Sequence, residues 1–279
     1  MPLGVGAAVR RAAQTLAEAG SVSPDAEART LVAHVAGIEP GRLPLADPLD
    51  DAGVQALDLA VARRVAGEPV QHITGVAWFR TTHLTVGPGV FVPRPETETM
   101  AGWCLEHVSA GDRVVELCAG SGAISKALAV EGPGLDQWAL EVSPDAVTYL
   151  AANLAGTGAR VVEGDMADGL PELDSSVDLV VVNPPYVPLD AWESVPPDVR
   201  DHDPQLAVFS GADGLDALRV VADVAARLLR PGGLLATEHA EAQHSDVLAL
   251  YARHGSYDTV RDHRDLTGRW RFVTARRVL

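Results

Sequence analysis

One stretch of this sequence combines residue types that can hold a planar –NH₂ group. The apolar run 180–182 is followed by Asn183, Pro184, Pro185 and Tyr186. Because proline lacks a backbone N–H and restricts the backbone, the Asn183 side chain and the Pro184 carbonyl can both present acceptor oxygens in fixed positions. Tyr186 supplies an aromatic face for a planar group. We therefore expect the substrate to be an amide or an aromatic amine, bound at the end of a buried strand.

A second stretch has the glycines and the acid that a nucleoside site needs. The apolar run 113–117 leads into Gly120 and Gly122. Glycines let the backbone approach a ligand closely, and the start of the following helix offers free N–H groups. Glu141 lies 19 residues after Gly122, at the end of the next apolar run, where one carboxylate can accept both hydroxyl protons of a ribose. We favour ribose binding over a plain strand-to-helix turn.

Asp165 and Met166 follow the third apolar run, where the adenine of such a nucleoside would lie. Asp165 can accept from an exocyclic amine, and Met166 can pack on the ring. Asp165 can equally cap a helix, and the sequence leaves both interpretations open.

The elements that must position these residues alternate between strand and helix from residue 112 onward. We expect strands at 113–118, 137–142, 160–163, 178–183 and 233–238, and helices at 122–130, 144–154, 215–229 and 241–253. This alternation predicts a mostly parallel sheet with helices on both faces and a ligand site at the carboxyl ends of its strands. Two strand-like runs, 257–263 and 269–275, follow one another without a helix and predict a terminal antiparallel hairpin.

The first third of the chain has a different organisation. Apolar residues at helical spacing predict a small all-helical domain over residues 1–69, with its third helix at 52–65. The β-rich runs 70–75 and 82–86 predict a β-hairpin linker within residues 70–96, and the α/β domain then spans 97–279. A helix is expected from about residue 96 to 107.

Charge and composition exclude several classes of function. The 279 residues contain 38 Asp and Glu against 22 Lys and Arg, a net charge of −16. Nucleic-acid backbones and anionic membranes attract basic surfaces, so we expect neither direct nucleic-acid binding nor membrane binding. No apolar run approaches the roughly 18 residues of a membrane-spanning helix. The two cysteines, Cys104 and Cys118, have no metal-ligand cluster around them, so we expect no metal and a reducing, cytoplasmic setting.

The glycine loop followed by Asn-Pro-Pro-Tyr resembles class I S-adenosylmethionine-dependent methyltransferases that act on amino nitrogens. More closely, nearly the whole chain resembles the protein-(glutamine-N5) methyltransferases of peptide chain release factors. That resemblance is carried by residues 68–75, by Phe91-Val92-Pro93-Arg94-Pro95-Glu96-Thr97-Glu98, by residues 211–215, by Glu238-His239 with Gln243, and by residues 265–269.

The resemblance implies a Rossmann-like class I methyltransferase domain with a seven-stranded sheet, S-adenosylmethionine as cofactor, and the glutamine of the Gly-Gly-Gln loop of release factors as substrate. The helical domain would dock the release factor. The implied cofactor residues are Glu116, Cys118, Ala119, Gly120, Ser121, Gly122, Glu141, Asp165, Met166 and Asn183. The implied substrate residues are Pro93, Arg94, Asn183, Pro184, Pro185 and Tyr186, of which Asn183, Pro184 and Tyr186 would carry catalysis.

The chain departs from the family pattern at several of these positions. Glu116 and Glu141 stand where aspartate is usual, Cys118 replaces a glycine, and Met166 stands where an aromatic residue is common. Two other functions remain open. An adenine-N6 DNA methyltransferase shares the Asn-Pro-Pro-Tyr chemistry but needs a positive DNA-binding surface. A non-catalytic protein that binds the cofactor would keep the fold without turnover.

Overall fold

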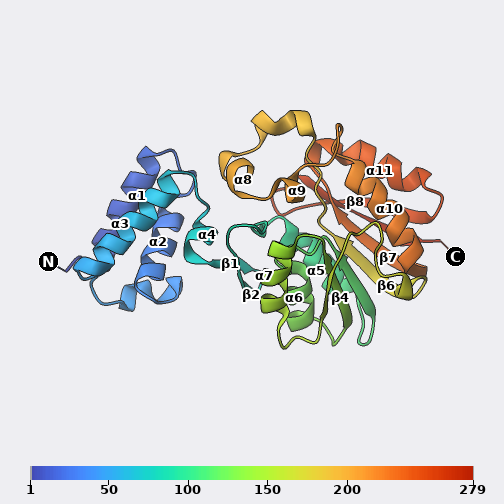
Figure 1. Cartoon of the computed structure of the whole chain (residues 1–279), viewed down its shortest axis with the longest axis horizontal. Coiled ribbons are helices and arrows are strands. Elements are labelled where there is room, and N and C mark those ends of the chain that lie inside the picture. The colour runs from blue at the N-terminus through green and yellow to red at the C-terminus, as the bar shows by residue number, and fades with distance from the viewer. Residues whose placement is uncertain (1, 279) are drawn as a thin grey trace. The chain divides into compact units, whose positions relative to one another are not determined.

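A computed structural model describes residues 2–278 (Figure 1), and their contacts divide the chain into two compact units. Unit 1 comprises the residues up to Val76 together with Pro196–His202, and unit 2 comprises Ala77–Val195 and the chain from Asp203 onward. This division falls within the segment predicted as a linker and assigns most of that segment to unit 2. Among residues 2–278, none of the helices has both the length and the apolar character that a membrane crossing requires.

Unit 1 is a helical domain, as predicted. Helices α1 (Val5–Glu18), α2 (Pro24–Val35) and α3 (Asp51–Val65) bury an apolar core, with η1 (Pro40–Leu45) and α4 (Val70–Thr74) packed beside them and α8 (Pro197–His202) in the same unit. Helix α3 begins where the Asp50 side chain accepts a hydrogen bond from the Gly53 N–H, 2.8 Å away. Such a cap satisfies one of the free N–H groups of the first turn.

The prediction of a strand over residues 70–75 is wrong, because this run forms helix α4. Pro69 precedes the helix, and Gly75 ends it in the left-handed conformation at φ +73°. Val70 and Ile73 lie three residues apart on one side of α4 and are buried in the core of unit 1. Burial of that apolar pair overrides the β propensity of the branched side chains. The hairpin lies just beyond, as β1 (Val76–Phe79) paired with β2 (Thr82–Thr85).

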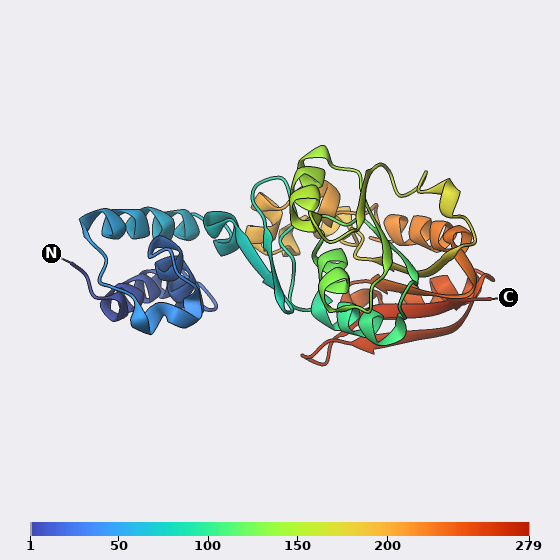
Figure 2. The same ribbon diagram turned by 90° about the horizontal axis from the view of Figure 1, so that it is seen from below.

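Unit 2 contains one seven-stranded sheet in the order β5-β4-β3-β6-β7-β9-β8. Strands β3 to β7 run parallel, and β9 pairs antiparallel with both β7 and β8. The terminal hairpin therefore forms one edge of the sheet (Figure 2, red). The strands are β3 (Arg113–Leu117), β4 (Asp136–Glu141), β5 (Arg160–Glu163), β6 (Val177–Val182), β7 (Leu229–Glu238), β8 (Tyr257–Arg264) and β9 (Trp270–Arg277). The predicted parallel sheet and antiparallel hairpin are confirmed.

Helices cover both faces of this sheet, as the alternation along β6 shows. Leu179 and Val181 pack against α5 (Thr97–His107), α6 (Ala123–Glu131) and α7 (Pro144–Leu154). Val180 and Val182 pack against α10 (Asp216–Leu228) and α11 (His244–Arg253). The remaining short helices are η2 (Pro171–Leu173), η3 (Leu189–Ser194), α9 (Gln205–Val208) and η4 (Glu241–Gln243).

The strand order reverses at β3, which lies between β4 and β6. Leu117, the last residue of β3, is in register with Leu140 of β4 and with Val182 of β6. The segments that follow these three strands therefore emerge side by side. Open α/β sheets bind their ligands at such a reversal, beyond the carboxyl ends of the strands.

Candidate active site

The glycine loop after β3 adopts the backbone conformations that its glycines were expected to provide. Gly120 and Gly122 have φ of +54° and +82°, a region that side chains rarely adopt. A Cβ at Gly122 would lie 2.6 Å from the Leu150 side chain, whereas a Cβ at Gly120 would meet nothing within 4 Å. The loop is therefore packed against the helices at Gly122 and open at Gly120, which is where a ligand can approach the backbone.

Glu141, at the end of β4, is held against this loop by two backbone groups. The Gly120 N–H donates to Oε2 across 2.8 Å, and the Ser143 N–H donates to Oε1 across 2.9 Å. The side chain is buried, and each carboxylate oxygen has a further lone pair. The structure thus brings the predicted ribose acceptor together with the glycine loop and fixes its orientation.

The Glu116 side chain contacts helix α6. Its Oε2 accepts hydrogen bonds from the backbone N–H and the hydroxyl of Ser125, in the first turn of α6. Burial raises the pKa of this carboxyl to about 8, against the opposing effect of the Ser125 hydrogen bonds. In its described contacts Glu116 ties strand β3 to helix α6.

Cys118 and Met166 meet beside the loop, with the two sulfur atoms 3.5 Å apart. Burial raises the pKa of the Cys118 thiol, which disfavours the nucleophilic thiolate. Asp165 is exposed, and its Oδ1 accepts from the Ala167 N–H at 2.8 Å. This contact caps the turn that follows β5.

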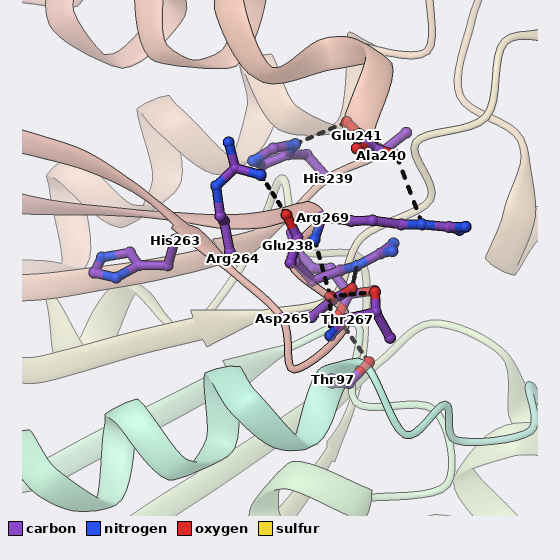
Figure 3. A network of polar contacts seen from close by, with 12 residues as sticks. Thr97, Glu238, His239, Ala240, Glu241, His263, Arg264, Asp265, Thr267 and Arg269 are labelled. Carbon is purple, nitrogen blue, oxygen red and sulfur yellow. Dashed lines mark hydrogen bonds and ion pairs between the residues drawn. The ribbon is translucent and has the colours of Figure 1, made fainter.

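Asn183 follows β6 and contacts Thr97, the first residue of α5. The Asn183 Nδ2 lies 3.4 Å from the Thr97 hydroxyl oxygen. That hydroxyl in turn donates to Glu238 Oε2 across 2.6 Å (Figure 3). Glu238 ends β7 and is almost completely buried. Three segments that are far apart in the sequence thus meet in one hydrogen-bonded chain at the predicted amide-binding residue.

Tyr186 is held by the same glutamate. Its hydroxyl donates to Glu238 Oε1 across 3.1 Å, and burial together with the Glu238 charge raises the pKa of the phenol. The positive charge of Arg271 lies near both groups, and the Arg271 Nε donates to Asp265 at 3.2 Å. Thr267 and the Arg269 N–H also donate to Asp265 (Figure 3), and these hydrogen bonds fix the turn between β8 and β9.

The backbone of the Asn-Pro-Pro-Tyr segment is anchored by Gln243. Its Nε2 donates to the Tyr186 carbonyl across 2.8 Å and lies 3.2 Å from the Gly214 carbonyl. Its Oε1 accepts from the Ala240 N–H at 3.0 Å. The runs 211–215 and 238–243 therefore support the segment from behind.

Pro93 and Arg94 lie in the segment before α5. The Arg94 guanidinium forms an ion pair with the buried Asp203 at 2.5 Å and stacks over the Phe91 ring, 5.0 Å from its centroid. Asp203 also accepts from the Val92 N–H at 3.3 Å. Arg94 thus restrains this segment, and its predicted substrate contact stays a prediction.

Sequence reasoning missed the polar partners behind the site. Glu238 and Arg271 received no role, although Glu238 lies within a run that carries the family resemblance. His239 also received no role, although its ring is fully buried and its Nε2 lies 3.1 Å from Asp262. A charged residue at the end of the apolar strand predicted over 233–238 was the available signal for Glu238.

Comparisons with known proteins show what this chain is similar to. Residues 7–75 match the family described as PrmC N-terminal domain, and residues 84–193 match the Methyltransferase small domain. The release factor glutamine methyltransferase of Streptomyces coelicolor is 48% identical over 278 residues, which cover 98% of each chain.

Two further proteins are similar at greater distance. A 4-amino-L-phenylalanine/4-methylamino-L-phenylalanine methyltransferase of Streptomyces pristinaespiralis is 38% identical, over 90% of this chain and 83% of its own. A crystal structure of a methyltransferase from Pyrococcus furiosus superposes with a TM-score of 0.52 at 17% identity. That superposition covers 70% of this chain and 89% of the other, and at this identity it supports the fold alone.

Proposed function

This chain belongs to the release factor glutamine methyltransferase family, and from that membership and the site geometry we propose its reaction. It transfers a methyl group from S-adenosylmethionine to the side-chain amide nitrogen, N5, of the glutamine in the Gly-Gly-Gln loop of peptide chain release factors. The observation that carries the proposal is the fixed Asn183 carboxamide, whose Nδ2 faces Thr97 and whose Oδ1 is thereby left to accept from a substrate amide.

The residues around the glycine loop fit a nucleoside cofactor. Backbone space is open at Gly120, and the oriented Glu141 carboxylate has lone pairs for a ribose diol. Cys118 and Met166 form the neighbouring apolar surface. S-adenosylmethionine supplies a methyl group on a positively charged sulfur, and these residues would hold its nucleoside part.

The protein must make a poor nucleophile react. The lone pair of an amide nitrogen is delocalised into the carbonyl, so the ground-state amide attacks weakly. Asn183 Oδ1 and the Pro184 carbonyl accept the two N–H hydrogens, which draws them out of the amide plane and directs the lone pair at the methyl group. Positive charge that develops on nitrogen is stabilised by the same two oxygens, and the nitrogen loses one proton to water after the methyl transfer, which gives the neutral N-methyl amide. Near-attack placement of this kind can contribute about 7–11 kcal/mol.

We assign docking of the release factor to unit 1. Residues 7–75 match a domain family of their own, and this unit exposes apolar side chains, among them Leu59 on α3 and Val22 in the segment before α2. A net charge of −16 supports a protein partner over DNA, because duplex DNA would be repelled.

Transfer of labelled methyl from S-adenosylmethionine tests the proposal directly. Four acceptors are compared: a purified release factor, its Gly-Gly-Ala loop variant, duplex DNA and 4-amino-phenylalanine. We expect label only on the release factor that carries the glutamine. Label on DNA would instead establish an adenine methyltransferase, and label on 4-amino-phenylalanine alone would establish an arylamine enzyme. Cofactor binding without any label would favour a non-catalytic protein.

A further inference from the structure

Glu238 stands behind the proposed amide site without facing the substrate. The side chain is 1% exposed at the end of β7, and both of its oxygens accept from hydroxyl groups. Thr97 lies 2.6 Å from Oε2, and Tyr186 lies 3.1 Å from Oε1. Burial raises the pKa of Glu238, whereas the hydrogen bond from Thr97, the charge of Arg271 and the hydrogen bond from Tyr186 oppose that rise and favour the carboxylate. Because Thr97 and Tyr186 both donate to it, Glu238 acts here as a carboxylate that only accepts hydrogen bonds.

The single proton of Thr97 then determines the rest of the chain of contacts. A hydroxyl has one hydrogen to donate, and the 2.6 Å contact with the carboxylate is a strong charge-assisted hydrogen bond that uses it. Toward Asn183, at 3.4 Å, the Thr97 oxygen can therefore only accept. Only the –NH₂ side of the Asn183 carboxamide can face Thr97, and the oxygen must face the other way.

We propose that Glu238 and Thr97 form a directional hydrogen-bond relay that sets the orientation of the Asn183 carboxamide. This inference rests on the proposed function. The carboxamide group of an asparagine rotates about χ2 at small energetic cost, because that torsion has a broad, two-fold profile. In the reversed orientation Asn183 would present –NH₂ to the substrate –NH₂, so two donors would face each other and the substrate amide would lose its acceptor. Glu238 is thus a positioning residue that acts through Thr97.

Reversing the relay by substitution distinguishes it from simple packing. Glu238→Gln replaces one of the two acceptor oxygens with an –NH₂ group. With its oxygen toward Tyr186 and its –NH₂ group toward Thr97, the glutamine donates to Thr97, an arrangement that the carboxylate cannot offer. The Thr97 hydroxyl then donates toward residue 183. A Thr97 hydroxyl that donates cannot pair with the –NH₂ group that Asn183 presents to it in the productive orientation. It can pair with a carboxylate oxygen of an aspartate at 183, whose second oxygen remains free to accept from the substrate.

The experiment compares wild type, Glu238→Gln, Asn183→Asp and the double variant, with kcat and KM for a release factor and with unfolding midpoints. We expect Glu238→Gln to lower kcat about tenfold with little change in KM. Asn183→Asp lowers kcat by roughly 10²–10³, since its carboxylate faces an oxygen that cannot donate. The double variant regains at least tenfold over Asn183→Asp, and its midpoint lies above the sum of the single effects. Thr97→Ser keeps the hydroxyl and should lose less kcat than Glu238→Gln.

The matched control is Tyr186→Phe combined with Asn183→Asp. Tyr186 binds the other oxygen of Glu238, so this pair should show no recovery. A Glu238→Gln/Asn183→Asp variant that is no more active than Asn183→Asp, or whose midpoint is additive, overturns the relay. Wild type that fails to methylate any release factor overturns the proposed function instead. The midpoints still test the relay in that case, because they require no activity.

Discussion

The backbone of Gly214 lies directly against the carbonyl oxygen of Tyr186. A Cβ at Gly214 would stand 2.4 Å from that oxygen and 2.6 Å from Gln243 Nε2, the group that binds it. Gly214 also has φ of +74°. The close approach lets the run 211–215 brace the Asn-Pro-Pro-Tyr segment, so that a residue outside the proposed site controls where Asn183 lies.

Replacing Gly214 with alanine should therefore reduce activity as well as stability. Relief of the clash needs a backbone shift of about 1 Å, and a misplacement of that size can lower turnover roughly 10²-fold. The control is Gly268→Ala, which also has positive φ, at +84°, but where a Cβ meets nothing within 4 Å. That variant should lose only about 1 kcal/mol of unfolding free energy and keep wild-type kcat. Equal kcat losses in the two variants would show that the brace has no role.

Asn183→Ala should lower kcat by roughly 10²–10³, as expected for removal of one preorganised polar group. The unfolding midpoint should change little, because Asn183 is only partly buried and its described hydrogen bond is long, at 3.4 Å. Methyl-transfer kinetics and thermal unfolding on the same preparation separate the two effects. Near-normal turnover of a folded variant would exclude Asn183 from the mechanism.

The substrate can be varied to test the same chemistry. A release factor with glutamate in place of the target glutamine offers no N–H donors and brings a negative charge to two acceptor oxygens. Sites built around a donor can reject such analogues by about 10⁴–10⁵. We expect no labelled methyl on the glutamate form under conditions that saturate the glutamine form. Methylation of both forms at comparable rates would contradict an acceptor-lined pocket.

Much of this arrangement follows from local sequence. The ends of β3, β4 and β6 are marked by apolar runs that stop at Gly120, Glu141 and Asn183, and parallel strands necessarily bring such ends to one edge. The prediction of a strand over 70–75 is wrong because the β propensity of Val70 and Ile73 carries no information about the core in which they pack. Burial of these two side chains in the core of unit 1 determines the helical conformation of that segment.

The hydrogen-bond partners of the site residues could not be predicted from local sequence patterns. Thr97 and Glu238 are 141 residues apart, and only the packing of α5 beside β7 joins them. His239 is likewise buried by its contact with Asp262 on β8, 23 residues away. A single sequence shows that such residues are polar, but their partners are defined only once the sheet order is known.

Glu116 predicts a pH dependence of stability. Its pKa is raised to about 8 in the folded chain, mainly by burial, with Glu141 adding to the rise and Ser125 opposing it. The folded state therefore binds this proton more tightly than the unfolded state, and the stabilisation present at low pH is lost as pH rises from about 4.5 through 8. Glu116→Gln keeps an acceptor for Ser125 and cannot ionise. Unfolding free energies measured from pH 5 to 9 should fall more steeply for wild type than for the variant, and parallel curves would contradict the assignment.

Cys118 adopts a strained backbone conformation that glycine would adopt without strain. Its φ is +53°, a left-handed conformation that costs a non-glycine residue about 1–3 kcal/mol. Against this stand the lost contact with Met166 and the greater freedom of glycine in the unfolded chain. We expect Cys118→Gly to raise the unfolding free energy by about 1 kcal/mol, or the midpoint by a few degrees. The same substitution at Cys104, which is fully buried within α5, should lower the midpoint, since it opens a cavity and places glycine inside a helix. A loss of stability at both positions would mean that the side-chain contact at Cys118 outweighs its backbone strain.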